Sequence, residues 1–149
     1  PPCRYPPQGS RSFGPARGLL YGGPDYFERA NEEVLTFALI ETAAALASLP
    51  DILAVPGLDG LYVGPNDLAL SMGFPPKLEP DHPEVLAAME RIARLAGEAG
   101  KIVGTHIISA EATARRLGEG YSMLTPGSDV TFASRAAQDA VKRLRGTGS

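Results

Sequence analysis

The chain has 149 residues, a formal net charge of −3, 44% hydrophobic residues and 21% charged residues. This size fits a single domain with its own hydrophobic core, and the weak negative charge gives no indication of a nucleic-acid partner. No apolar stretch approaches the ~18 residues of a membrane helix, the N-terminus lacks the layout of a secretory signal, and the lone Cys3 excludes an internal disulfide. We therefore expect a cytoplasmic protein that binds neither nucleic acid nor a membrane.

The first part of the chain is predicted to be irregular. Residues 1–23 are rich in proline and glycine, which interrupt helices and central strands, so we expect a loop there. Apolar residues at helical spacing in 24–33 predict a helix that packs against a sheet. At the other end, residues 146–149 are expected to form a disordered tail after the βα units of 24–145.

From residue 34 onward, apolar runs of strand length alternate with helical segments. The alternation indicates βα units, and the first of these helices is expected to stop at Pro50. Ser109 is the expected N-cap of a later helix. The predicted strands cover 34–40, 58–63, 101–108 and 121–124, and the predicted helices cover 42–49, 68–72, 85–99, 109–117 and 129–145.

Strands separated by helices in this way imply right-handed βαβ connections and a parallel sheet. A doubly wound nucleotide-binding sheet is disfavoured because no glycine-rich phosphate turn follows the first strand. Two strand-like runs instead end near acidic residues, Glu41 and Asp67, about one strand–helix unit apart. Parallel strands of a barrel end on one rim, so these carboxylates are predicted to converge on a divalent cation such as Mg²⁺.

The residues around Asp67 also suggest an anion site. The backbone N–H groups of Asn66 and Asp67 are expected to open the helix that begins at Leu68, where they favour a substrate carboxylate. Two simpler interpretations stay open on the residues alone. An aspartate before a helical run ordinarily caps the helix, which is the alternative for Asp67, and the alternative for Glu41 is an interaction with the positive end of the helix that begins at Thr42.

Four ordered segments carry a family resemblance. They read RYPPQGSRSFGP at 4–15, FALIET at 37–42, YVGPNDLA at 62–69 and TPGSD at 125–129. In this order they resemble the HpcH/HpaI class II pyruvate aldolases. The resemblance implies the C-terminal half of a (β/α)₈ TIM barrel and a metal-dependent enzyme that cleaves or forms 4-hydroxy-2-oxo acids from pyruvate and an aldehyde.

The resemblance also assigns roles to residues of this chain. Glu41 and Asp67 match the metal ligands of the family, for which Mg²⁺, Mn²⁺ or Co²⁺ is expected. The turn that receives the carboxylate of pyruvate, or of a related 2-oxo acid, matches Gly64, Pro65, Asn66 and Asp67. Leu39 stands where some relatives carry a polar glutamine, and its side chain is expected to line the pocket.

The likeness begins only near the exit of the fourth strand of the family barrel. In the family, the preceding half supplies a catalytic histidine with an acidic partner and an arginine that steadies the enolate. No residue here matches them, so no catalytic residue is assigned. Two other functions therefore stay open: an inactive truncated barrel that keeps metal and oxyacid binding, and a citrate-lyase-like acyl-CoA lyase, against which the Gly-Pro-Asn-Asp segment argues.

Three further residues are of the types that could replace the missing groups. His106 is expected to be a pocket-wall residue near a strand end, Arg11 an anchor of the opening loop, and His82 a residue of the outer layer. Four strands of a barrel also leave two open edges, and the last helix carries apolar positions within 130–144. We therefore expect a homo-oligomer.

Overall fold

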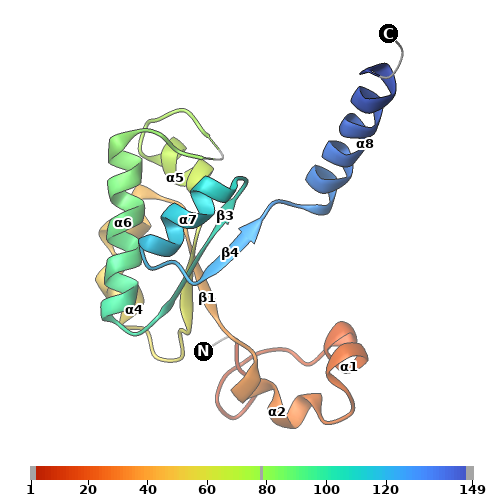
Figure 1. The fold of residues 1–149 in the computed structure, drawn as a ribbon. Coiled ribbons are helices and arrows are strands. Elements are labelled where there is room, and N and C mark those ends of the chain that lie inside the picture. Colours follow the sequence, from red (N-terminus) through yellow and green to blue (C-terminus); the bar gives the residue numbers. More distant parts are fainter. Residues whose placement is uncertain (1–2, 78, 147–149) are drawn as a thin grey trace.

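The protein contains a four-stranded parallel sheet with helices between its strands, as seen in a computed structural model that describes residues 3–77 and 79–146. The strand order is β1-β2-β3-β4, and each strand pairs only with its neighbours in sequence (Figure 1). This confirms the predicted parallel α/β sheet. The strands are β1 (Phe37–Ile40), β2 (Gly60–Val63), β3 (Ile102–Ile107) and β4 (Met123–Pro126).

Helices precede, connect and follow the strands. The longest connecting helix, α6, packs along β2 and β3 and is contacted by α4 and α5. Ser109 caps α7 as predicted, since its Oγ accepts a hydrogen bond from the Ala112 N–H at 3.1 Å. The helices are α1 (Ala16–Gly22), α2 (Tyr26–Glu33), α3 (Ala43–Ala47), α4 (Leu49–Leu53), α5 (Pro65–Ser71), α6 (Pro83–Glu98), α7 (Ala110–Gly118) and α8 (Asp129–Gly146).

The two faces of the sheet have different surroundings. One face is fully packed, because alternate strand residues such as Ile40, Val63 and Val103 meet the apolar side of α6 and are almost completely buried. On the other face the side chain of Leu39 is 52% exposed. Parallel sheets are normally covered on both faces. The sheet therefore has one complete core and one open face.

The strand register aligns the residues of the open face in rows. Leu39, Tyr62, Gly104 and Met123 are successive register partners across the sheet, and we call them the lower row. Continuing the register toward the carboxyl ends of the strands gives the upper row. It consists of Glu41 after β1, Gly64 after β2, His106 on β3 and Thr125 on β4.

Three predicted boundaries were wrong. The segment 1–23 is not irregular throughout, because α1 forms after Pro15, where alanine and leucine residues favour a helix. The helix after β1 does not run to Leu49 and stop at Pro50, because α3 already ends at Ala47 and α4 begins at Leu49 with Pro50 at its second position, where no N–H is needed. The expected tail begins inside α8, whose last residue is Gly146, and the remainder, 147–149, lies outside the described residues.

The prediction that the helix at 24–33 packs against the sheet was also wrong. The Phe27 ring of α2 instead packs against the opening loop, with ring centroids 5.3 Å from Tyr5 and 5.4 Å from Phe13. In the same cluster the Arg11 guanidinium lies 4.7 Å from the centroid of the Tyr5 ring and donates a hydrogen bond to the Tyr26 hydroxyl at 3.3 Å. Residues 3–33 therefore form a small layer of their own beyond the amino end of β1 (Figure 1).

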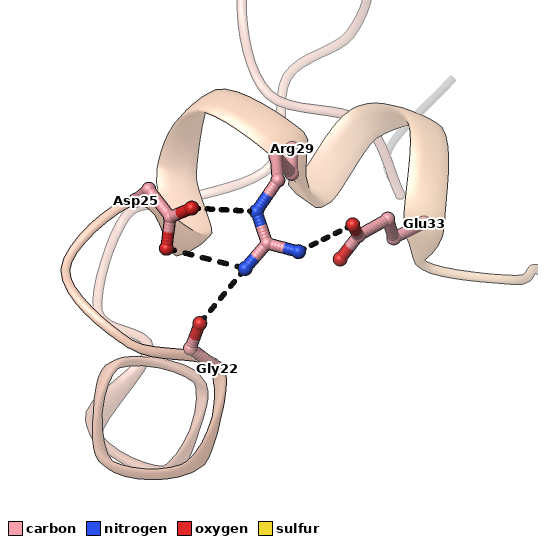
Figure 2. A network of polar contacts seen from close by, with 4 residues as sticks. All are labelled: Gly22, Asp25, Arg29 and Glu33. Carbon is pink, nitrogen blue, oxygen red and sulfur yellow. Dashed lines mark hydrogen bonds and ion pairs between the residues drawn. The ribbon is translucent and has the colours of Figure 1, made fainter.

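An arginine network joins the two helices of this layer. Figure 2 shows Arg29 paired with Asp25 and Glu33 on α2 and donating a 3.0 Å hydrogen bond to the Gly22 carbonyl at the end of α1. The hydrogen bonds from Arg29 hold the pKa of the Asp25 carboxyl below its usual value. These exposed ion pairs add little stability, so the aromatic contacts carry most of the packing.

The C-terminal helix projects away from the sheet (Figure 1). In the described part of the chain α8 buries none of its side chains, and Val130, Phe132 and Val141 are all exposed. None of the described helices combines the length and the apolar character that crossing a membrane requires.

Glycine substitutions at two positions test the packing of the sheet. A Cβ at Gly60 would lie 2.5 Å from the Phe37 ring and 2.6 Å from the Ile102 carbonyl oxygen. We expect Gly60→Ala to lower the free energy of unfolding by about 1–3 kcal/mol through this overpacking. A Cβ at Gly97 of α6 would meet no heavy atom of another element within 4 Å in the described structure, so Gly97→Ala should raise the free energy of unfolding by about 0.5–1 kcal/mol. Urea unfolding measures the free energy of both variants, and the same change in Gly60→Ala and Gly97→Ala would contradict the packing described.

Arg11 is tested as an anchor of the opening loop. Arg11→Met removes the stacking on Tyr5 and should lower the free energy of unfolding by about 0.5–1 kcal/mol. Because Arg11 also lines a pocket with Thr36 and Phe37, at the amino end of β1, we expect no change in divalent-cation binding at the opposite end of the strands. Urea unfolding and Mn²⁺ titration make this comparison. A variant of unchanged stability with weakened Mn²⁺ binding would contradict it.

Candidate functional site

The carboxylate of Glu41 lies beside the start of α5. Glu41 follows β1, and the preceding Ile40 carbonyl accepts a hydrogen bond from the Gly64 N–H at 3.1 Å. A Cβ placed on Gly64 would be 3.1 Å from both Cβ and Oε2 of Glu41. The Glu41 side chain therefore occupies the space that a side chain at Gly64 would need, and it rests over the turn between β2 and α5.

Asp67 reaches the same corner through α5. Gly64 is the N-cap of this helix, Pro65 is its first residue, and Asp67 is an exposed residue of its first turn. The Leu68 N–H is the one that bonds back to the Gly64 carbonyl, at 2.9 Å. The N–H groups of Asn66 and Asp67 precede it and have no acceptor within the helix. Glu41 and the segment 64–67 thus meet at one corner of the sheet, between β1 and β2.

This geometry bears on the simpler roles predicted for the two acids. Asp67 is not an N-cap, because Gly64 holds that position and α5 has no side-chain cap. Thr42 caps the helix after Glu41, accepting a hydrogen bond from the Ala45 N–H at 3.0 Å. The Glu41 side chain leans instead toward Gly64 and α5. The simple capping role predicted as an alternative for Asp67 is therefore wrong.

The oxygen atoms at this corner suit a hard divalent cation. No ion pair among the described residues involves Glu41 or Asp67, and the buried Oδ1 of Asn66 has no hydrogen-bond partner there. The described residues contain no cluster of three or more histidine, cysteine or acidic side chains that would hold a metal. Two carboxylates are nevertheless a usual protein contribution to a Mg²⁺ site, in which substrate and water complete the shell.

A second polar group on the open face was missed by the sequence analysis. The Tyr62 hydroxyl and the Thr125 Oγ1 lie 2.8 Å apart, so β2 and β4 are joined across β3. The connection is possible because Gly104 lies between them, where a Cβ would be only 3.0 Å from Cδ2 of the Tyr62 ring. The sequence did hold one signal. Tyr62 and Gly64 are two residues apart, as are Gly104 and His106, so the residues of each pair lie on the same face of the sheet.

The remaining candidates fall in different places. His106 is half-buried in the upper row and lines a small cavity with Met89 of α6 and Arg116 of α7, a cavity that neither Glu41 nor Asp67 lines, so its place in the wall of the candidate site stays a prediction. Leu39 is exposed on the open face, and its Cδ1 lies 3.9 Å from the position of a Cβ on Gly64. His82 stacks on Phe74 with ring centroids 4.7 Å apart and has a packing role. Arg11 belongs to the N-terminal layer, as described above.

Known proteins are similar to this chain in sequence and in fold. The chain is 39% identical over 141 residues to a hydroxypyruvate/pyruvate aldolase of Rhizorhabdus wittichii, covering 95% of this chain and 56% of that protein. It is 38% identical over 149 residues to a 4-hydroxy-2-oxo-heptane-1,7-dioate aldolase of Shigella flexneri, covering 98% of this chain and 55% of that protein. The chain thus spans little more than half the length of these relatives.

A solved structure shows the same arrangement. An HpcH/HpaI aldolase/citrate lyase family protein from Burkholderia cenocepacia matches with a TM-score of 0.81 and 32% identity, over 96% of this chain and 57% of that one. This supports the prediction of a partial TIM barrel. Residues 2–136 match the family model described as HpcH/HpaI aldolase/citrate lyase. The chain therefore belongs to the HpcH/HpaI aldolase/citrate lyase family.

Proposed function

We propose that this chain carries the metal and carboxylate half of the active site of a metal-dependent aldolase. The reaction cleaves or forms 4-hydroxy-2-oxo acids, with pyruvate or a related 2-oxo acid and an aldehyde as the partners. The observation that carries the proposal is the Glu41 carboxylate resting over Gly64, at the start of the helix whose first turn holds Asp67. The names of the two curated relatives, both aldolases, support the same reaction class.

Glu41 and Asp67 would hold the cation, which is Mg²⁺, Mn²⁺ or Co²⁺ in this proposal. Both supply the hard oxygen donors that these ions accept, and neither is neutralised by a basic side chain of the described residues. When bound, such an ion polarises the 2-oxo group and stabilises negative charge that develops there. Gly64 contributes because it has no side chain that would displace the Glu41 carboxylate.

The first turn of α5 would orient the substrate. The N–H groups of Asn66 and Asp67 point from the positive end of this helix and would receive the substrate carboxylate. In the cleavage direction, the C3–C4 bond breaks, the C4 hydroxyl gives up its proton as C4 becomes the aldehyde, and C3 gains a proton to become the methyl group of pyruvate. We assign no residue of this chain to these proton transfers, and we place them in the part of the barrel outside it.

We also propose a homo-oligomer in the cytoplasm. The exposed apolar residues Val130, Phe132 and Val141 follow one helix, α8, that stands away from the sheet. Exposed apolar side chains on a helix of this kind are candidates for an interaction surface.

Metal and oxyacid binding can be tested without turnover. In calorimetry with Mn²⁺ and then oxalate, we expect the wild type to bind both, and Glu41→Gln and Asp67→Asn each to weaken Mn²⁺ at least tenfold because a charged ligand is lost. Asp51→Asn is the matched control, since Asp51 occupies the corresponding first-turn position of the short helix α4 and should bind normally. Equal Mn²⁺ affinity in all four proteins would contradict the site.

Activity distinguishes the proposed enzyme from its alternatives. With pyruvate, a short aldehyde and Mn²⁺, we expect slow aldol turnover by the chain alone, reduced by about 10²–10⁴ because an acid–base group is missing. Glu41→Gln should abolish it. Oxalate binding with no turnover above Glu41→Gln would favour the inactive truncated barrel. Cleavage of a citrate-type acyl-CoA without aldol turnover would favour the acyl-CoA lyase.

A further inference from the structure

Polar side chains also gather on the side of the open face opposite the proposed metal corner. Tyr62 and Thr125 form the 2.8 Å hydroxyl pair, and His106 is the register partner of Thr125 on the neighbouring strand. All three belong to the rows that face away from the packed core. They come from β2, β3 and β4, whereas Glu41 follows β1, so the open face has an acidic side and a side of hydroxyl and imidazole groups.

The hydroxyl pair retains unused hydrogen-bonding capacity. Each hydroxyl group has one donor hydrogen and two acceptor lone pairs, and the pair uses only one hydrogen. The second hydrogen and several lone pairs are free to meet a ligand, because Thr125 is exposed and Tyr62 only half-buried. The position of the pair is fixed, since Gly104 allows the Tyr62 ring to cross β3. The result is a preorganised polar group.

The spacing fits a single short substrate. Neighbouring strands lie about 4.8 Å apart, so β4 lies about 10 Å from β2, and Tyr62 spans this distance to place its hydroxyl beside Thr125. A 2-oxo acid held at its carboxyl end by the corner at Gly64 would extend its aldehyde-derived end over β3 toward this pair. His106, in the upper row between Gly64 and Thr125, borders the same path.

We propose that Tyr62, Thr125 and His106 form a polar wall that binds a hydroxyl group on the aldehyde-derived part of the substrate. The protein then prefers hydroxyaldehydes to alkyl aldehydes of equal size. This inference rests on the proposed function and adds the substrate class. A site built to hydrogen-bond a substrate hydroxyl discriminates against the analogue that lacks it, because its polar groups are left unpaired.

Two ligands that differ by one hydroxyl group provide the test. Calorimetry of the whole chain, loaded with Mn²⁺, compares 4-hydroxy-2-oxopentanoate with 4,5-dihydroxy-2-oxopentanoate of the same C4 configuration. We expect the second ligand to bind the wild type about three- to tenfold more tightly, the usual effect of one hydrogen bond. In the double variant Tyr62→Phe with Thr125→Val the two affinities should become equal. Tyr21→Phe, at an exposed tyrosine of α1, should keep the wild-type ratio.

The outcomes separate this inference from the function on which it rests. If the wild type binds the two ligands with equal affinity, or if the double variant keeps the affinity ratio of the wild type, only the polar wall is overturned. A wild type that binds Mn²⁺ but neither ligand overturns the proposed function and the polar wall with it. Equal weakening of both ligands in the double variant means that the pair only stabilises the sheet, which also overturns the inference. If the double variant does not fold, the ratio of the two ligand affinities is measured for Thr125→Val alone, which changes an exposed position.

Discussion

The rest of the site depends on the parallel pairing of β1 with β2, which places Glu41 at the end of β1 beside Gly64 at the end of β2. Because the strands are parallel, both chains leave the sheet at the same end, and the hydrogen bond from the Gly64 N–H to the Ile40 carbonyl keeps them together one residue beyond the strand. The missing side chain of Gly64 then gives the Glu41 carboxylate its place. A shift of register by one residue would turn Glu41 toward the packed face.

The same alternation that builds the core leaves the face with the candidate site open. Ile40, Val63 and Val103 point toward α6 and hold the sheet, whereas their neighbours Leu39 and Tyr62 point the other way. In a closed barrel that second face would be an interior. Here it is bordered by two strands, β1 and β4, that each have one unpaired side, while the Tyr62–Thr125 hydrogen bond ties β4 to the middle of the sheet. The polar groups of this face are therefore fixed by the sheet itself.

The sequence was most informative where period and turn chemistry agree. Alternating strands and helices, the cap at Ser109 and the acids after β1 and β2 were all predictable, since each depends on local pattern. The packing of α2 was not, because its helical period gives an apolar side but not the surface that this side meets. Pro50 misled for a related reason: a proline that ends one helix can equally begin the next.

The hydroxyl pair of the polar wall lay beyond sequence reasoning because it joins strands that are not neighbours. Its two partners are 63 residues apart, and the contact exists only because Gly104 removes a side chain from the strand between them. No local pattern reports such a three-strand arrangement. The resemblance to a family suggested the candidate metal ligands but not this pair, since Tyr62 and Thr125 entered it only as parts of longer motifs.

The central claim is that Glu41 and Asp67 bind one cation at the corner beside Gly64. The most direct measurement is the paramagnetic broadening of backbone amide NMR signals by substoichiometric Mn²⁺. The account predicts that the amides of Glu41, Gly64, Asn66 and Asp67 broaden first and together, and that those of the aromatic layer at 3–33 stay sharp. Broadening centred elsewhere, or separately at Glu41 and at Asp67 with different affinities, would contradict it.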